Sequence, residues 1–297
     1  MNEDSKQRIE PGLYVVATPI GNLSDLGRRA CDILKEVDLI ACEDTRVSRV
    51  LLDSIGVHAR TIAAHEHNER DASSRIVAAL EAGLRVALVC DAGTPAISDP
   101  GAVVVATVRA AGHRVVPVPG ACAVTTLLSV AAFGEGGYCF AGFVPSRRRD
   151  REAFVSAARD SPRPTVFFES PHRIGDTLAA IQAQCEAERR LVLGRELTKR
   201  FEEIADLRVS DALAWLEADP NRMRGEYVIA LAAAPARPRV DPGDVVSLGI
   251  DALLAALMPE LGANRSARLV QGLTGGDRRA LYARALALKP DDDGGNT

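Results

Sequence analysis

The stretch VCDAGTPAISDPG, residues 89–101, places a kinked loop with two carboxylates directly after an apolar segment. Residues 85–90 (RVALVC) predict a β-strand that is buried on both faces. Two glycines and two prolines then prevent regular structure, and Asp91 and Asp99 lie within the resulting loop. In open α/β sheets, ligands bind beyond the carboxyl ends of the strands, so this loop is a candidate binding site.

The alternation of apolar strands and amphipathic helices extends in both directions from this loop. Further strands are predicted at residues 13–18, 37–42 and 114–118, with helices at 26–35, 47–55, 70–81 and 102–111. Strands that are apolar on both faces and separated by helices indicate a mostly parallel sheet with helices on each side.

A second series of elements begins after Pro119 and Gly120. It comprises a helix at 121–132, strands near 138–143, 165–169, 191–196 and 227–232, and helices at 149–159 and 174–184. A proline-rich linker at 235–243 then leads to a small helical segment. The sequence therefore predicts an α/β fold, with an N-terminal α/β domain at 12–120, a C-terminal α/β domain at 121–234, a small helical domain at 244–288, and flexible tails at 1–11 and 289–297.

The composition limits the class of protein. The chain has 297 residues, of which 47% are hydrophobic and 26% charged, which suits one large or two medium globular domains. The polar start MNEDSKQRIEPG is unlike a signal peptide, and the longest apolar run, residues 121–133, is shorter than the ~20 residues of a membrane span. Six scattered cysteines without a CxxC pair are typical of reduced residues in the core of a cytoplasmic protein.

Two further loops follow predicted strands. The loop TPIGNL, residues 18–23, lacks the GxGxxG spacing that brings a helix N-terminus onto a pyrophosphate, which disfavours NAD and FAD. The loop VPGAC, residues 118–122, contains a glycine that permits close approach of the backbone to a ligand. Together with residues 89–101, these loops are expected to form one ligand-binding edge.

The two carboxylates of the central loop have different interpretations. Ser98 or Asp99 followed by Pro100 is a typical helix start, so Asp99 is expected to begin the next helix. Asp91 lies at the strand tip, where no cap is needed, and is predicted to be functional. Carboxylates repel phosphate but attract a ligand with positive charge and ribose hydroxyls, such as S-adenosylmethionine. A metal held by Asp91 and Asp99 is disfavoured, because no His or Glu is close in sequence to complete the site.

Eight ordered sequence blocks resemble the ribosomal RNA small-subunit methyltransferase I family of the tetrapyrrole methylase-like superfamily. They are ATPIGNLSDL (17–26), IACEDTR (40–46), CDAGTPAISDPG (90–101), VPVPGACA (116–123), FAGFVPSRRRDR (140–151), FFESPHRI (167–174), RELTKRFEE (195–203) and RGEYVIA (224–230). The resemblance covers residues 12–234, and the final helical segment fits the family by position and character. One departure is Ala121, where the family usually has proline.

The resemblance implies two α/β domains of the tetrapyrrole methylase type, with S-adenosylmethionine in the cleft between them. It also implies a homodimer and 2′-O-methylation of a cytidine in the decoding region of small-subunit (16S) rRNA, as naked rRNA or as the assembled subunit. Carried over to this sequence, the expected cofactor contacts are Pro19, Gly21, Asp91, Thr94, Pro95, Ala121, Cys122, Phe168 and Glu169.

Methyl transfer to a ribose hydroxyl requires a group that removes or stabilises the proton of a poor nucleophile. The candidates at predicted strand ends are Glu43, Asp44, Glu169, Glu196 and Lys199. Asp44 could instead cap a helix, and Glu196 with Lys199 could form an ordinary surface ion pair. The catalytic base is therefore not assigned, and no metal is predicted.

The formal net charge of −4 does not indicate a protein surface that is basic overall, so contact with RNA must come from local basic patches. The candidates are Arg147, Arg148, Arg149 and Arg151, then Lys199 and Arg200, and the pair Arg222 and Arg224. Aromatic residues form only 4% of the chain, so phosphate contacts and shape are expected to outweigh base stacking.

Two other functions remain open from the sequence. A methylase acting on a tetrapyrrole would share the fold but would be expected to lack EDTR, ESPHR and RELTK. A non-enzymatic sensor of an adenosyl ligand, with a helical binding module at its C-terminus, would bind the cofactor without transferring a methyl group.

Overall fold

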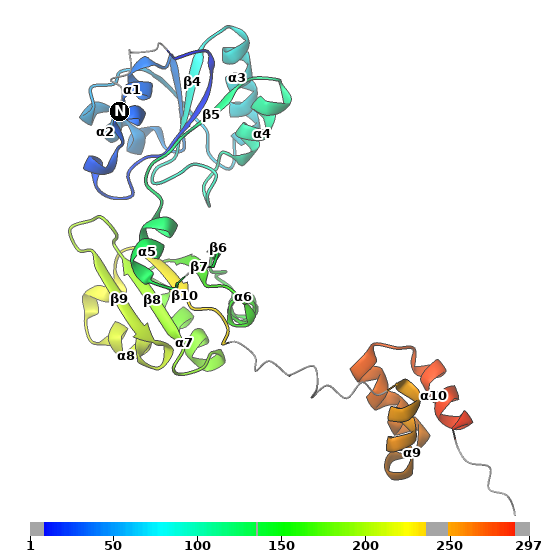
Figure 1. Ribbon diagram of the computed structural model, residues 1–297. Coiled ribbons are helices and arrows are strands. Elements are labelled where there is room, and N and C mark those ends of the chain that lie inside the picture. The colour runs from blue at the N-terminus through cyan, green and yellow to red at the C-terminus, as the bar shows by residue number, and fades with distance from the viewer. Residues whose placement is uncertain (1–8, 135, 236–248, 289–297) are drawn as a thin grey trace, which may run out of the picture. The chain divides into compact units, whose positions relative to one another are not determined.

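The computed structural model describes residues 9–134, 136–235 and 249–288 (Figure 1). Residues up to Pro235 form one compact unit with two sheets, and the C-terminal helices belong to a second unit, which is described by itself below. The predicted flexible tails lie outside the described residues, except for 9–11. There, Ile9 packs against the first core, and the hydroxyl of Tyr14 donates to the carbonyl of Glu10.

The first half of the larger unit, residues 12–120, contains a fully parallel five-stranded sheet in the order β3-β2-β4-β1-β5. Its strands are β1 (Gly12–Val16), β2 (Leu39–Cys42), β3 (Arg60–Ala63), β4 (Arg85–Val89) and β5 (Val115–Val118). Its helices are α1 (Arg28–Glu36), α2 (Thr45–Ser54), α3 (Glu69–Glu81) and α4 (Ala102–Ala110), and a 3-10 turn, η1 (Leu23–Asp25), precedes α1. The parallel sheet agrees with the sequence prediction, which missed only the short edge strand β3.

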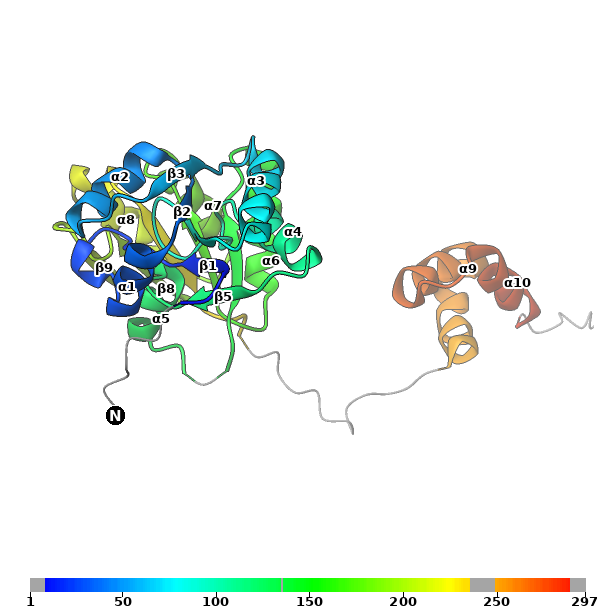
Figure 2. The same cartoon turned by 90° about the horizontal axis from the view of Figure 1, so that it is seen from above.

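Successive side chains of each strand point to opposite faces of the sheet, so the sheet contributes to two hydrophobic cores. Val16 and Ile40 face one side, where they pack with Leu34 of α1 and Leu52 of α2. Their neighbours face the other side and pack against α3 and α4, in a cluster that includes Leu13, Leu39, Ala41, Ile76, Leu88, Val104 and Val108. Figure 2 shows α1 and α2 on one side of the strands and α3 and α4 on the other. Because both faces are covered, the strands are apolar throughout.

The second half, residues 121–234, contains a mixed sheet in the order β6-β7-β10-β8-β9. Its strands are β6 (Cys139–Phe143), β7 (Thr165–Glu169), β8 (Arg190–Arg195), β9 (Glu203–Arg208) and β10 (Tyr227–Leu231). Only β6 and β7 pair in parallel, whereas β10 lies antiparallel to both of its neighbours and β8 antiparallel to β9. The second sheet is therefore mostly antiparallel. A hairpin joins β8 to β9, a strand that the sequence did not reveal.

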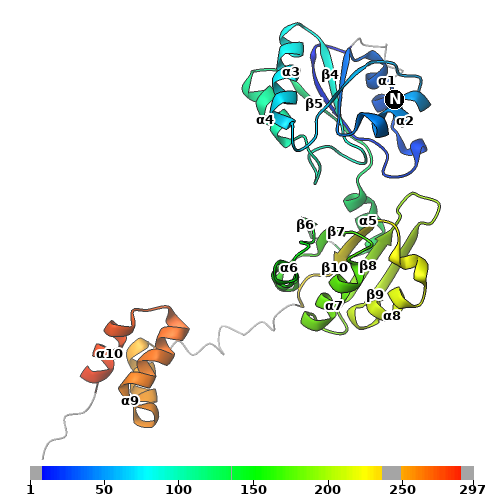
Figure 3. The same ribbon diagram turned by 180° about the vertical axis from the view of Figure 1, so that it is seen from behind.

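Helices also cover both faces of the second sheet. α6 (Arg148–Asp160), α7 (Ile174–Gln184) and α8 (Ala212–Glu217) lie on one face, where Phe167 and Ile181 belong to the core. α5 (Ala123–Ala131) packs on the opposite face through Leu127, against Val192 and Val228. Figures 1 and 3 place α5 between the two sheets. Two 3-10 turns, η2 (Val209–Asp211) and η3 (Pro220–Met223), flank α8.

The start of α4 corrects one prediction. Gly101 occupies the N-cap position, and no side chain from the loop caps the helix. Instead, Glu69 of α3 accepts hydrogen bonds from the backbone N–H groups of Gly101 and Val103, at 2.7 and 3.1 Å. The expectation that Asp99 begins this helix is therefore wrong, because a residue thirty positions earlier already satisfies the helix donors.

The C-terminal unit contains α9 (Ile250–Thr274) and α10 (Arg278–Ala287). Gly262 has a non-helical backbone within α9, so the helix is broken into two segments there. A small core joins both parts of α9 to α10, with Leu254, Val270 and Leu281 at its centre. No helix within the described ranges is long and apolar enough to cross a membrane.

Candidate functional site

Hydrogen bonds tie together the three loops that follow β1, β4 and β5. Thr18 and Gly93 exchange backbone hydrogen bonds, with N···O distances of 2.8 and 3.1 Å. The hydroxyl of Thr94 donates to the carbonyl of Ala121 at 3.1 Å. Gly93 has a φ of 83°, a conformation that glycine adopts without strain. The ligand-binding edge predicted from the sequence is therefore a single connected structure.

Unusual backbone conformations gather in two loops. Among the described non-glycine residues, five have positive φ angles: Ala96, Ser98, Ala132, Glu196 and Thr198. Two of them lie in the loop after β4 and two in the loop after β8. Strain of this kind costs on the order of 1–3 kcal/mol per residue and concentrates at functional sites. The two loops belong to different sheets, and both line the same pocket.

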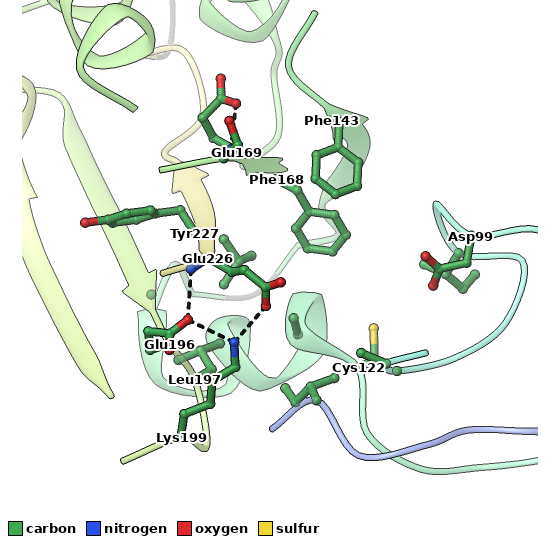
Figure 4. Close-up of a pocket in the computed structure, with 18 of the residues that line it drawn as sticks. Asp99, Cys122, Phe143, Phe168, Glu169, Glu196, Leu197, Lys199, Glu226 and Tyr227 are labelled. Atoms are coloured by element: carbon green, nitrogen blue, oxygen red, sulfur yellow. Dashed lines mark hydrogen bonds and ion pairs between the residues drawn. The ribbon is translucent and has the colours of Figure 1, made fainter. Parts of the chain in front are cut away.

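That pocket, here called the cleft pocket, lies between the two halves of the larger unit and has a volume of about 360 Å³. The three loops that follow β1, β4 and β5 contribute Ile20, Ala92, Gly93, Thr94, Ile97, Asp99 and Cys122. The second half contributes Phe143 and Phe168, the loop after β8, and the start of β10. Figure 4 shows side chains converging on the pocket from both directions.

One wall of the cleft pocket is aromatic. Phe168 makes edge-to-face contacts with Phe140 and Phe143, at centroid distances of 5.1 and 5.2 Å. Phe143 remains more than half exposed although it is large and apolar. Such a wall suits a planar, aromatic ligand group, which would cover the exposed ring.

The opposite wall carries an ion-pair cluster. The ammonium of Lys199 donates to Glu196 Oε1 at 2.9 Å and to Glu226 Oε2 at 2.8 Å (Figure 4). Burial acts to lower the pKa of Lys199, but hydrogen bonds to Glu226 and Glu196 outweigh it and raise that pKa. Burial likewise acts to raise the pKa of Glu196, but hydrogen bonds from Lys199 and from the Glu226 N–H lower it. Lys199 therefore stays protonated and Glu196 ionised.

Asp99 faces the same pocket from the first half. Burial raises its pKa to about 6, and the negative charge of Glu43 adds to the rise. Cys90 lies beside it, and burial together with the charge of Asp99 raises the pKa of this thiol. Burial thus makes ionisation of Asp99 less favourable than in water, and a positively charged group beside it would favour the carboxylate; the sequence pattern predicted a helix cap instead.

Glu169 lines the cleft pocket through its position at the end of β7, but its carboxylate points away from Phe168 and Lys199 (Figure 4). Oε1 accepts from the Ser170 N–H and from two nitrogens of Arg173, and Oε2 accepts from the hydroxyl of Thr177. The side chain is fully buried. These contacts fix the start of α7 and leave the carboxylate engaged within the fold.

A second, more open depression adjoins the cleft pocket and is here called the loop hollow. Its volume is about 680 Å³, and it is lined by Thr18, Pro19, Ile20, Gly21, Leu23, Asp44, Arg46, Val47, Val50, Leu51, Asp91, Ala92, Lys199 and Glu226. Asp91 Oδ1 accepts from the Asp44 N–H at 3.1 Å, and Glu43 Oε2 accepts from the Asp91 N–H at 3.3 Å. Asp44 caps α2 and pairs with Arg46, as its alternative interpretation proposed.

The structure divides the predicted cofactor residues between these two spaces. Thr94, Cys122, Phe168 and Glu169 line the cleft pocket, whereas Pro19, Gly21 and Asp91 line the loop hollow. Ala121 contributes its carbonyl to the loop contacts, and Pro95 is buried within the loop. Among the predicted catalytic residues, Glu169, Glu196 and Lys199 line the cleft pocket, and Asp44 and Lys199 line the loop hollow. Glu43 accepts a hydrogen bond from the Asp91 N–H. Glu226 was missed, although its block RGEYVIA had been singled out.

The predicted RNA-binding arginines fall into two groups. Arg147 and Arg149 are exposed at the start of α6, and Arg148 pairs with Glu152. Arg151 is buried and donates to Asp176 at 3.0 Å. Arg222 is held by Glu203 and lies over the ring of Trp215 at 4.2 Å. Arg200 is exposed beside Phe201, so Arg147, Arg149 and Arg200 face solvent and Arg151 and Arg222 serve the fold.

Potential metal-ligating side chains do not cluster within the described ranges. No group of three or more His, Cys, Asp or Glu side chains there could hold a metal ion. All six cysteines are free; Cys42 and Cys90 are buried as predicted for core residues, whereas Cys139 is exposed on the edge strand β6.

Comparison with known proteins identifies the family. The family model described as "Tetrapyrrole (Corrin/Porphyrin) Methylases" matches residues 12–213. The chain belongs to the tetrapyrrole methylase family. A second family model, described as "RsmI C-terminal HTH domain", matches residues 245–289 of this tetrapyrrole methylase.

Relatives place this tetrapyrrole methylase among the ribosomal RNA enzymes of the family. It is 43% identical over 274 residues to ribosomal RNA small subunit methyltransferase I of Escherichia coli O157:H7, covering 92% of this chain and 94% of that protein. It is also 43% identical over 290 residues to the protein of the same name from Mesorhizobium japonicum, covering 97% and 96%. This tetrapyrrole methylase is therefore a methyltransferase of the ribosomal RNA small subunit methyltransferase I group.

A solved structure shows the same fold at low sequence identity. The uroporphyrin-III C-methyltransferase of Thermus thermophilus, complexed with S-adenosylhomocysteine, superimposes with a TM-score of 0.53 at 15% identity, covering 74% of this chain and 97% of that one. The likeness shows a shared fold. The predicted α/β class of the tetrapyrrole methylase type, with C-terminal helices, is thereby confirmed.

Proposed function

We propose that this chain transfers a methyl group from S-adenosylmethionine to the ribose 2′-hydroxyl of a cytidine in the decoding region of small-subunit rRNA. The cleft pocket carries this proposal, because one space joins an aromatic wall to carboxylates supplied by both halves of the unit. The names of the relatives support rRNA as the substrate class. The choice of nucleotide and of the 2′-oxygen rests on the family resemblance.

The pocket residues fit the methyl donor. Phe143 and Phe168 offer a surface for its adenine ring, and Asp99 offers a half-buried carboxylate for its positively charged part. Thr94 and Cys122 line the pocket and would contact the donor, with the carbonyl of Ala121 held beside them by Thr94. Pro19, Gly21 and Asp91 line the adjoining hollow, and Pro95 is buried within its loop. When bound, the donor supplies a sulfonium-activated methyl group.

The chain itself supplies positioning and charge. Lys199 is held between Glu196 and Glu226, so its ammonium has a fixed place at the edge of the cleft pocket. Because its pKa is raised, Lys199 cannot take a proton from a hydroxyl, but its charge stabilises a hydroxyl oxygen that is losing one. Glu226 has a side chain that is 80% exposed, so its carboxylate can accept a hydrogen bond from an incoming ribose. Orientation of the two substrates then provides much of the rate.

The basic residues that face solvent are proposed to contact phosphates. Arg147 and Arg149 follow β6, which contributes Phe143 to the pocket, and Arg200 follows Lys199 directly. Phosphate contacts of this kind position an RNA without reading its sequence. A homodimer in the cytoplasm, acting on rRNA or on the assembled subunit, is proposed from the same resemblance, and sedimentation velocity would measure the state of assembly.

Incorporation of tritiated methyl groups tests this function. Small subunits purified from cells that lack the protein should accept label, and digestion to nucleosides should place it on 2′-O-methylcytidine. Label on a corrin or porphyrin alone would support a methylase that acts on a tetrapyrrole substrate. Cofactor binding without transfer to any of these acceptors would support a non-enzymatic sensor of the adenosyl ligand. Either result would refute the proposal.

A further inference from the structure

The loop hollow is lined in part by large apolar side chains that remain exposed to solvent. Val47 and Val50 are one helical turn apart on α2, and their exposed fractions are 46% and 66%. Leu23 of the turn η1 is also exposed and lines the same depression. These three apolar side chains, here called the α2 shelf, all line the loop hollow, where water covers surface that a ligand could bury.

The loop hollow and the cleft pocket share a wall. Ile20, Ala92, Lys199 and Glu226 line both spaces. A ligand in the hollow would therefore contact the same ammonium and carboxylate as a ligand in the cleft pocket. In a group-transfer enzyme the two reacting molecules must meet, so the acceptor site has to adjoin the donor site in this way.

We propose that the loop hollow is the subsite for the nucleoside that receives the methyl group. The base lies against the α2 shelf, and the ribose is directed toward Lys199 and Glu226. This inference rests on the proposed function, and it adds the place where the RNA inserts its target residue. A nucleoside in this hollow is withdrawn from base stacking, as enzymes that modify nucleic acids generally require.

Polar groups around the α2 shelf match a nucleoside. Arg46 extends from the rim with its guanidinium largely in solvent, where it can contact a flanking phosphate. Within the described residues, Asp91 has a hydrogen-bond partner only at Oδ1, so its other oxygen can accept from an amine or a hydroxyl. Apolar contact with a base plane and acceptors at its edge are how proteins commonly recognise unstacked RNA bases.

A single negative charge introduced on the α2 shelf tests the proposal. Val50→Glu places a carboxylate where the base should lie and should raise KM for small subunits on the order of tenfold. The affinity for S-adenosylhomocysteine, measured by calorimetry, should not change. The matched control is Val130→Glu on α5, because Val130 is 55% exposed and lines neither space. This control should keep the wild-type KM.

A second readout does not depend on turnover. Small subunits carrying 5-iodocytidine would be irradiated with the protein, and the attached peptide would be identified by mass spectrometry. Cross-links to residues 45–54 or 21–25 are expected for the wild type and should be lost with Val50→Glu. Cross-links confined to other segments would overturn the proposal.

The outcomes separate this inference from the function on which it rests. Absence of methyl transfer by the wild-type protein would refute the proposed function. Normal transfer and normal subunit KM in Val50→Glu would refute the subsite alone. Equal losses of subunit and S-adenosylhomocysteine affinity would also refute it, as would conversion of a dimer to monomers, which would make the α2 shelf an interface between copies.

Discussion

Gly21 packs directly on Lys199, and a Cβ atom at Gly21 would overlap the lysine side chain. The loop after β1 is therefore pressed against the cation shared by the cleft pocket and the loop hollow. Gly225 packs against Glu196 in the same way, because a Cβ atom at Gly225 would lie 2.5 Å from the Cγ atom of Glu196. Two glycines from different segments hold the ion-pair cluster in place.

Replacing Gly21 with alanine should displace Lys199 and lower kcat. We expect a loss on the order of a hundredfold, because small misplacements of a positioning group are costly. The control is Gly27→Ala, since no atom lies within 4 Å of a Cβ at Gly27, and it should keep full activity. Single-turnover kinetics with saturating subunits would measure both, and equal rates for the two variants would contradict the contact.

Lys199 itself should be needed for its charge. Lys199→Met should reduce the single-turnover rate about a hundredfold, in the range for one group that assists proton transfer. Lys199→Arg keeps the charge and should recover part of that loss. Retention of the full rate by the methionine variant would show that the ion-pair cluster is only structural.

Asp99 should make stability depend on pH. Its folded pKa of about 6 lies above the usual value of about 3.9, so between these pH values the folded state binds more protons. Stability contributed by the neutral form is complete below about pH 4 and is lost as the pH rises through 6. Asp99→Asn should therefore unfold at higher urea concentration than the wild type at pH 7, but not at pH 4. Parallel pH profiles of the two proteins would contradict this.

Glu169 should contribute to stability. Glu169→Ala would leave Arg173 and Thr177 without their carboxylate, at a cost of about 3 kcal/mol of unfolding free energy. Urea titration would measure this loss. Glu226→Ala, at the exposed carboxylate, is the comparison and should cost less than 1 kcal/mol, roughly the value of a surface ion pair. Similar losses for the two variants would contradict the assigned roles.

The arginines of α6 are expected to have two different roles, one in contact with RNA and one in the stability of the fold. Arg149→Ala should reduce the slope of log affinity against log salt by about 0.7, the value for one lost phosphate contact on single-stranded RNA. Arg151→Ala should leave that slope unchanged but lower the urea midpoint, because Arg151 is buried against Asp176. Filter binding of small subunits across a salt series would distinguish them, and a change of slope in Arg151→Ala would contradict the division.

Local patterns predicted most of the architecture. The apolar strands β1, β2, β4 and β5 and their helices follow from hydrophobic periodicity. β3 was missed because its four residues include an exposed arginine at the sheet edge. β9 was missed because its sequence, EIADLR, is half charged and breaks the polar–apolar alternation that is typical of a strand.

The site was harder to predict, because long-range contacts decide the roles of its residues. Asp99 has the sequence of a helix cap, but Glu69 takes that role and leaves Asp99 facing the pocket. Arg151 belongs to a basic run, yet only the packing of α6 on α7 shows that it is buried. Glu226 has no local signal, and its importance comes from Lys199, which lies 27 positions earlier.

The wall common to the cleft pocket and the loop hollow limits how such an enzyme can change. A substitution at Lys199 or Glu226 alters the surroundings of both spaces at once, so it cannot change the affinity for the acceptor without also affecting the methyl donor. Leu23, Val47 and Val50 touch only the outer space. Redesign toward a different acceptor should therefore begin at these three positions, because changes there leave the residues that line the cleft pocket unaltered.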